Sequence, residues 1–257
     1  MQAQSRLHSI RWIVPLFLLF SFLICMIGGA LNGGGIGMGK SRPQSTANAA
    51  VGDASDGKAT LTCVVIDAGH GGEDGGASSA AGLTEKDVNL AVALYLRDIL
   101  EAAGIPTVMT RTEDKLLYDR SVDFQGRKKV LDLAARRTIA DETPGCLFVS
   151  IHMNAFPEAQ YSGMQVWYGT QDARSADIAG GIQQGALTLM PDNHRKIKAA
   201  GSNIYLLDRI TSPAVLVECG FLSNPAEAER LGDEAYRQAL AMVIAGAILP
   251  FMQGGSV

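Results

Sequence analysis

Short apolar runs alternate along this chain with longer segments in which apolar residues recur every three or four positions. Short runs rich in β-branched residues predict buried strands, and the longer periodic segments predict amphipathic helices. Strands are expected at residues 63–66, 105–110, 146–152, 163–168, 203–207 and 213–218. Helices are expected at residues 84–103, 128–141, 173–190 and 224–252, the last interrupted at Gly232. This alternation predicts an α/β fold, a three-layer sandwich whose central, mostly parallel or mixed sheet is flanked by helices.

The helix at residues 84–103 has the clearest boundaries. Thr84 is a suitable N-cap, and Asp87 follows at the third position of a capping box. Gly104 comes directly after the last periodic residue, where helices often need a left-handed backbone. The pattern therefore predicts both ends of this helix as well as its existence.

The first 59 residues have a different pattern. Residues 12–27 are almost wholly apolar and follow Arg6 and Arg11, which predicts a signal peptide or membrane anchor within residues 1–30. The basic flank should stay in the cytoplasm, which puts the rest of the chain outside it. Residues 31–59 are rich in small and polar residues without periodicity, as in a flexible linker. One folded domain is then expected at residues 60–253.

Composition narrows the possible functions only a little. The formal net charge of −4 gives no indication of the basic surface that nucleic-acid-binding proteins carry. Cys63, Cys146 and Cys219 all lie in apolar strand contexts and show no C-x-x-C spacing. An odd number of cysteines outside the cell argues against a disulfide framework, so we expect them to act as small buried hydrophobic residues.

The most informative stretch follows the first predicted strand and reads Asp67-Ala68-Gly69-His70-Gly71-Gly72. A phosphate-binding loop of the G-x-G-x-x-G type starting at Gly69 would need a glycine where Asp74 stands, and no Lys-Ser or Lys-Thr pair follows. Two interpretations remain for this stretch taken alone: a glycine turn with a solvated histidine, or a metal site containing His70.

Two other titratable residues also end apolar runs. His152 ends the run at residues 146–152, and Glu218 ends the run at residues 213–218. Ligands of open α/β sheets bind beyond the carboxyl ends of the strands, so these groups and His70 can meet there. Glu85 falls in the first turn of the helix at residues 84–103, where an ordinary helix-stabilising carboxylate is an equally good explanation.

Four segments together resemble one protein family. They are Asp67-Ala68-Gly69-His70-Gly71-Gly72, Glu85-Lys86-Asp87, Ser150-Ile151-His152-Met153-Asn154-Ala155 and Glu218-Cys219-Gly220-Phe221-Leu222-Ser223-Asn224. In this order they resemble the motifs of zinc-dependent N-acetylmuramoyl-L-alanine amidases (amidase type 3). The compact length and single N-terminal apolar segment look most like the spore-cortex and germination amidases.

The resemblance implies Zn²⁺ bound by His70, Glu85 and His152, with Glu218 as the catalytic residue. Two histidines and one glutamate leave the fourth zinc position for water, as in catalytic zinc sites. The implied reaction is hydrolysis of the amide bond between the muramic acid lactyl group and L-alanine in peptidoglycan, on the cell wall or spore cortex side of the membrane. The regulatory partner of such an enzyme is not implied by these residues.

Two other functions stay open at this point. One is a peptidoglycan-binding module without catalysis, and the other is a zinc peptidase or deacetylase acting on the same polymer. The basic loop at residues 194–198 is a further candidate feature, because its positive charges could steer the carboxylates of stem peptides towards the site. An ordinary solvated loop explains it equally well.

Overall fold

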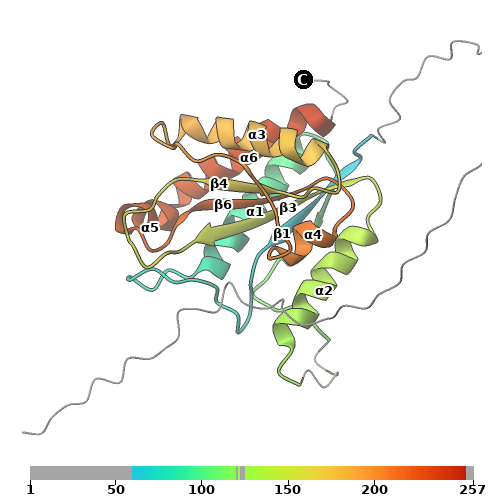
Figure 1. The fold of residues 1–257 in the computed structure, drawn as a ribbon, viewed down its shortest axis with the longest axis horizontal. Coiled ribbons are helices and arrows are strands. Elements are labelled where there is room, and N and C mark those ends of the chain that lie inside the picture. The colour runs from blue at the N-terminus through green and yellow to red at the C-terminus, as the bar shows by residue number, and fades with distance from the viewer. Residues whose placement is uncertain (1–59, 120, 122–124, 253–257) are drawn as a thin grey trace, which may run out of the picture. The chain divides into compact units, whose positions relative to one another are not determined.

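The structure is a computed structural model that describes residues 60–119, 121 and 125–252. The signal or anchor segment predicted within residues 1–30 and the linker predicted at residues 31–59 lie outside this part. The described residues form a sheet of six strands in the order β2-β1-β3-β6-β4-β5 (Figure 1). The strands are β1 (Cys63–Ala68), β2 (Thr107–Met109), β3 (Cys146–Asn154), β4 (Gln165–Tyr168), β5 (Lys198–Ala199) and β6 (Ala214–Phe221).

The sheet is mixed. Strands β2, β1, β3 and β6 are parallel neighbours, whereas β4 pairs antiparallel with β6 and parallel with β5. The parallel strands bring their carboxyl ends to one edge, which is where sites form in sheets of this kind. The helices are α1 (Glu85–Ala102), α2 (Lys128–Asp141), α3 (Arg174–Gly185), α4 (Tyr205–Arg209), α5 (Pro225–Gly232) and α6 (Glu234–Met252), with a 3₁₀ turn at Ala186–Thr188.

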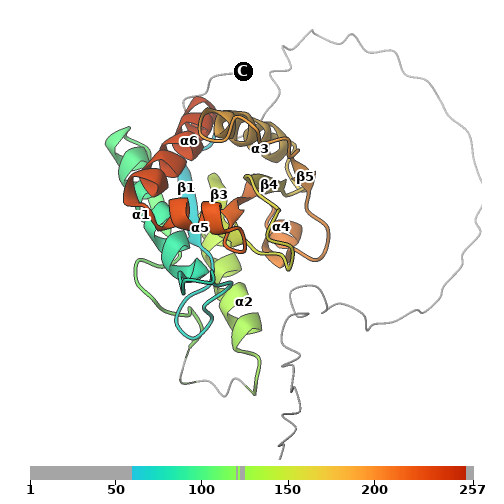
Figure 2. The ribbon, with the colours of Figure 1, turned by 90° about the vertical axis from the view of Figure 1, so that its left-hand side faces the viewer.

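Helices cover both faces of the sheet, so the predicted three-layer α/β fold is confirmed (Figure 2). Alternate strand residues point to opposite faces. Val64, Ile66 and their equivalents in β3 and β6 pack under α1, α3 and α6, while Val65 and Phe148 pack on the side of α2 and α4. Glu218 and His152 share this second face, because they alternate with residues of the first.

Among the described helices, α6 alone is long and apolar enough to cross a membrane. Its length and composition do not distinguish a membrane helix from a core helix. In this fold Leu240, Ile244 and Ile248 are fully buried in the larger core cluster. Their burial explains why α6 is apolar.

Several elements differ from the sequence predictions, including the two-residue strand β5, which was not predicted. A strand was predicted at residues 203–207, but residues 205–207 belong to helix α4. Leu206, Leu207 and Ile210 are buried on one side of it, a pattern that a short apolar run does not reveal. The 173–190 helix ends earlier, in a 3₁₀ turn, and β6 continues past Glu218 to Phe221.

Another difference concerns the start of α1. Thr84 is the N-cap, but its hydroxyl bonds to the Asp87 carboxylate and not to the helix backbone. The capping box is therefore not formed as predicted. Gly104 has a φ of 80°, which confirms the expected left-handed residue after the helix.

Candidate metal centre and active site

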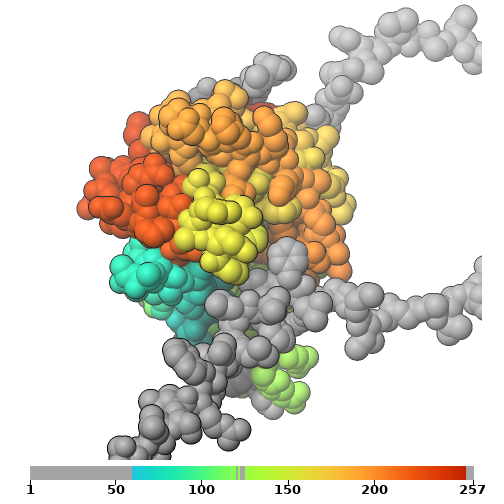
Figure 3. Space-filling model, turned by 60° about the vertical axis from the view of Figure 1, so that its left-hand side comes forward, coloured from blue at the N-terminus to red at the C-terminus, as the bar shows by residue number. Residues whose placement is uncertain are grey.

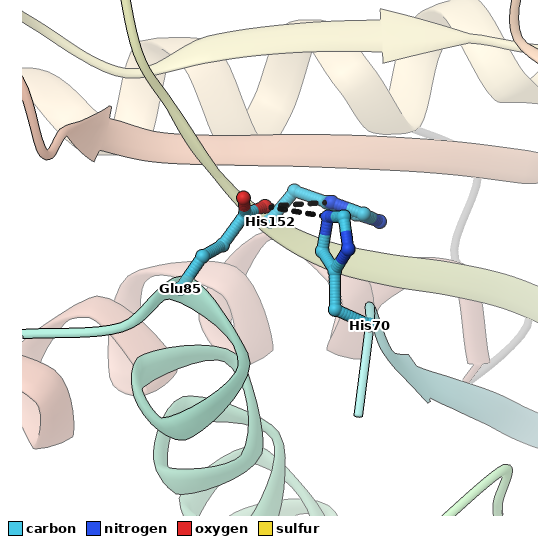
Figure 4. A group of neighbouring side chains, drawn as sticks. All are labelled: His70, Glu85 and His152. Carbon is cyan, nitrogen blue, oxygen red and sulfur yellow. Dashed lines mark hydrogen bonds and ion pairs between the residues drawn. The ribbon is translucent and has the colours of Figure 1, made fainter. Parts of the chain in front are cut away.

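Three side chains from three separate elements meet at the carboxyl edge of the sheet. His70 follows β1, Glu85 is the first residue of α1, and His152 lies near the end of β3 (Figure 4). Glu85 Oε1 lies 3.2 Å from His70 Nε2 and 2.9 Å from His152 Nδ1. One donor atom from each residue falls within 4.8 Å of the others. The structure thus brings together all three residues that the resemblance assigned to the metal.

These separations suit a tetrahedral zinc ion. With zinc–ligand bonds of about 2.05 Å and tetrahedral angles, neighbouring ligand atoms should lie about 3.3 Å apart. Both separations that involve Glu85 are close to this value. The second oxygen, Glu85 Oε2, accepts a hydrogen bond from the Ala77 backbone N–H at 2.8 Å, which fixes the carboxylate plane. The donor set therefore fits zinc in chemistry and in spacing.

The glycines of the first loop leave room for these side chains. A Cβ at Gly69 would collide with the imidazole of His152. A Cβ at Gly76, whose φ is +66°, would lie 2.5 Å from Glu85 Oε2. Close approach of the backbone to His152 and Glu85, and not phosphate binding, accounts for glycine at these two positions.

His70 itself has a φ of 61°, a left-handed backbone that few residues other than glycine adopt. Its carbonyl accepts a hydrogen bond of 2.7 Å from Arg136 Nη2. Its Nδ1 lies 2.9 Å from Asp74 Oδ2, so a carboxylate faces the ring nitrogen that is turned away from Glu85. Carboxylates in this position commonly orient metal-binding histidines.

A buried polar network below the loop was not predicted from the sequence. Asp67 Oδ1 accepts from Arg136 at 2.6 Å, and its Oδ2 accepts from Ser150 Oγ at 2.6 Å. Arg111 donates to the carbonyls of Ala68 and Gly69 at 2.9 Å and 3.0 Å. All four side chains are fully or almost fully buried. A signal existed in the sequence, since Asp67 and Ser150 interrupt otherwise apolar strands.

Glu218 stands beside the three donors without joining them. It is the register partner of His152 across the β3–β6 pair. Its Oε2 is shielded from solvent and has no hydrogen-bond partner among the described residues. A buried carboxylate oxygen without a partner is costly, and such atoms often mark functional sites. This arrangement suits a proton-transfer group that faces a reacting molecule.

The pKa values of the site are shifted in opposite directions. Burial raises the pKa of Glu218 to about 8, and the negative charge of Glu85 adds to this rise. Burial alone would also raise the pKa of Glu85, but His152 and His70 hold that pKa well below its usual range. Burial opposes protonation of His70, but Asp74 and Glu85 outweigh it and raise its pKa to about 9. Two carboxylates with pKa values driven apart are typical of sites that divide ligand and proton-transfer roles.

The basic loop at residues 194–198 contacts the end of β6. The Arg195 guanidinium stacks on the ring of Phe221, with 4.5 Å from Cζ to the ring centroid. Lys198 lies over Trp167 at 5.1 Å from the ring centroid. His194, Lys196 and Lys198 are exposed. The loop is thus partly ordered by aromatic contacts, and Arg195 contacts the strand that carries Glu218.

Known proteins share both the sequence pattern and the fold. Residues 64–250 match the family model described as N-acetylmuramoyl-L-alanine amidase. A germination-specific N-acetylmuramoyl-L-alanine amidase of Bacillus subtilis is 38% identical over 188 residues, which cover 73% of this chain and 78% of that protein.

Two solved structures extend the comparison. The CwlD amidase from Clostridioides difficile, solved in complex with the GerS lipoprotein, is 35% identical with a TM-score of 0.70, over 75% of this chain and 99% of that one. The catalytic domain of CwlV, an amidase from Bacillus (Paenibacillus) polymyxa, is 30% identical with a TM-score of 0.64, again over 75% and 99%.

Proposed function

Because this chain belongs to the N-acetylmuramoyl-L-alanine amidase family, we propose that it is a zinc-dependent enzyme acting on peptidoglycan. The bond it hydrolyses is the amide between the muramic acid lactyl group and L-alanine. One observation carries the proposal: His70, Glu85 and His152 converge with zinc-like spacing next to the unpartnered carboxylate of Glu218. A module that only binds the cell wall has no use for this combination.

The roles follow from the arrangement. Zinc, when bound, would lower the pKa of a water molecule to about 7 and polarise the amide carbonyl. Glu218 is the carboxylate placed to accept a proton from the attacking water and to pass it to the leaving nitrogen of L-alanine, so one residue would serve as base and as acid. Arg136 and Arg111 hold the loop carbonyls that set the position of His70. Asp74 orients its ring from the other side.

We further propose a place of action outside the cytoplasm, in maturation of the spore cortex. The support is the germination-specific amidase of Bacillus subtilis, which is 38% identical to this chain. The predicted N-terminal signal or anchor agrees with that location. The substrate is then the cortex peptidoglycan on the outer side of the membrane.

Mass spectrometry of the products tests the reaction. Purified peptidoglycan should yield free muramyl lactyl carboxylates together with peptides that begin with L-alanine. A zinc peptidase would cut inside the stem peptide, and a deacetylase would leave free amino sugars without releasing peptides. Treatment with a chelator should abolish the products, and added zinc should restore them. A chain that binds peptidoglycan but releases nothing would be a binding module, against the proposal.

A further inference from the structure

A hollow lies between the segment that follows β3 and the basic loop, and we call it the side pocket. It has a volume of about 360 Å³ and is lined by residues 160–162 and 192–195. One wall comes from the segment that follows β3, the strand of His152, and the other from the basic loop. Figure 3 shows that the segment after β3, in yellow, lies at the surface beside α5 in red-orange and the loop before α1 in teal. A ligand can therefore reach this region from solvent.

The side pocket is tied to the catalytic strand by Arg195. The guanidinium of this residue stacks on Phe221, which stands three residues after Glu218 in β6. Its Nε donates to the Ser162 carbonyl at 2.7 Å, which fixes the group in place. Three residues of strand span about 10 Å, so this distance separates Phe221 from Glu218 along β6.

Two opposite charges in the side pocket are left without ion partners. Asp192 and Arg195 both line it, yet they form no ion pair with each other or with any other described residue. The Nη atoms of Arg195 have no hydrogen-bond partner in the described part of the chain. A fixed cation and a separate anion in one hollow match a ligand group that carries a carboxylate and an ammonium together.

Resting on the proposed function, we propose that the side pocket binds the diamino-acid residue of the stem peptide. Arg195 binds a carboxylate of this residue, and Asp192 binds its ammonium group. An extended peptide advances about 3.5 Å per residue, so the third residue from the scissile amide lies about 10 Å away, near Phe221. The glycan strand is a poorer occupant, since its sugars are neutral once the lactyl groups are amide-linked.

The glycan alternative has one point in its favour. Phe156 and Tyr161 are exposed aromatic rings with centroids 5.4 Å apart, and sugars stack well on such surfaces. Sugar stacking would not need the charges of Arg195 and Asp192. The two occupants therefore differ in how binding responds to removal of each charge.

Calorimetric titration of the full chain with three tripeptides tests the assignment. The first is L-Ala–γ-D-Glu–diaminopimelate, the second replaces diaminopimelate by lysine and so lacks one carboxylate, and the third carries an acetyl group on the side-chain ammonium. We expect the first to bind about tenfold more tightly than either of the others, since charged hydrogen bonds contribute at this level.

The variants should remove these preferences one at a time. Arg195→Gln should weaken binding of the diaminopimelate peptide about tenfold and leave binding of the lysine peptide unchanged. Asp192→Asn should weaken binding of the diaminopimelate peptide by about the same factor and leave binding of the acetylated peptide unchanged. Lys198→Gln, a control in the same loop, should bind all three peptides as the wild type does.

Equal weakening of all peptides by Arg195→Gln, or no weakening, would overturn the assignment. The assignment would also be overturned if a peptide-free disaccharide bound in a manner that depends on Tyr161 and the tripeptides did not bind. Tripeptide binding needs no hydrolysis, so the proposed function is judged separately. If the chain shows the expected binding pattern but releases no peptides that begin with L-alanine, the assignment of the side pocket is supported and the proposed amidase activity is contradicted.

Discussion

Individual residues at the carboxyl edge of the sheet divide into donors, a proton carrier and supports. His70, Glu85 and His152 supply the donor atoms, whereas Glu218 stays outside their group. Arg136, which is paired with Asp67, donates to the His70 carbonyl and so fixes the loop that carries His70. Because these tasks fall to different side chains, substitutions should separate metal content, activity and stability.

Glu218→Gln should keep zinc and the fold but lose hydrolysis. Glutamine has the same shape and cannot accept the proton, and loss of general acid–base catalysis typically costs about 10²–10⁴-fold in rate. His70→Ala and His152→Ala should lose both zinc and activity, because two donors are too few. Metal analysis and turnover of the three variants check this. Loss of zinc in Glu218→Gln would make Glu218 a ligand instead.

Asp67→Asn should destabilise the fold in a pH-dependent manner. Burial favours the neutral carboxyl, but the ion pair with Arg136 and the bond from Ser150 outweigh it and hold the pKa of Asp67 below its usual 3.8. Its stabilising effect is therefore present above pH 3.8 and is lost as the pH falls through the lower folded value. Breaking a buried ion pair costs about 3–5 kcal/mol.

Urea unfolding of wild type and Asp67→Asn at neutral and acidic pH measures this effect. The gap in free energy of unfolding should be full at pH 7 and should shrink below pH 3.8. Asp98→Asn, an exposed carboxylate on α1, is the matched control and should change little. A gap that is constant over the whole range would contradict the assigned ion pair.

At the scale of elements, the short helix α5 holds the end of β6 next to the site. Asn224 caps this helix by accepting hydrogen bonds from the backbone N–H groups of Ala226 and Glu227. The buried carboxylate of Glu227 in turn accepts from the N–H groups of Phe221 and Gly163. The cap therefore supports both the strand end and one approach to the side pocket.

Asn224→Ala should lower the free energy of unfolding by about 1 kcal/mol, the usual effect of removing an N-cap side chain. Thermal melting with Glu229→Ala as a control on the same helix checks the value. Glu229 is exposed, so its removal should have almost no effect. Equal melting temperatures for Asn224→Ala and wild type would mean that the cap contributes nothing.

The elements also show what could be predicted from the sequence. Hydrophobic periodicity predicted β1, β3, β6 and α1, because these elements bury continuous apolar faces. It failed at α4, where five residues are too few to show a period. It also missed the support below His70, because the buried stripe of α2 contains Asp132 and Arg136. The pattern predicted the helix at residues 128–141 correctly, but it assumes apolar burial and so did not reveal that this helix packs through ion pairs.

The site was predictable for a different reason. His70, His152 and Glu218 follow or end strands, so sheet geometry alone brings them to one edge. Glu85 could not be placed in this way, because its contact with His152 depends on how the loop at residues 71–84 folds back. The side pocket was equally out of reach, since it forms between two loops whose paths no periodicity describes.

At the scale of the whole molecule, the described domain should work outside the cytoplasm. Arg6 and Arg11 precede the apolar residues 12–27, which predicts that the rest of the chain is exported. Alkaline phosphatase fused to the C-terminus should be active, and a reporter that works only in the cytoplasm should be silent. The reverse result would contradict the predicted orientation. Deletion of residues 1–30 should reverse both signals and serves as the control.

The positions of the three donors along the chain also make metal binding depend on folding of the domain. They are 15 and 67 residues apart in sequence and come from the loop after β1, from α1 and from β3, so an unfolded chain does not hold them together. A ligand that binds only the native state stabilises it in proportion to the logarithm of its free concentration. The melting temperature should therefore rise with the concentration of free zinc. At a hundredfold excess over the dissociation constant, zinc should add about 2.7 kcal/mol to the free energy of unfolding. His152→Ala should melt at one temperature at every zinc concentration. Export in the unfolded form would then leave folding to be completed where zinc is available.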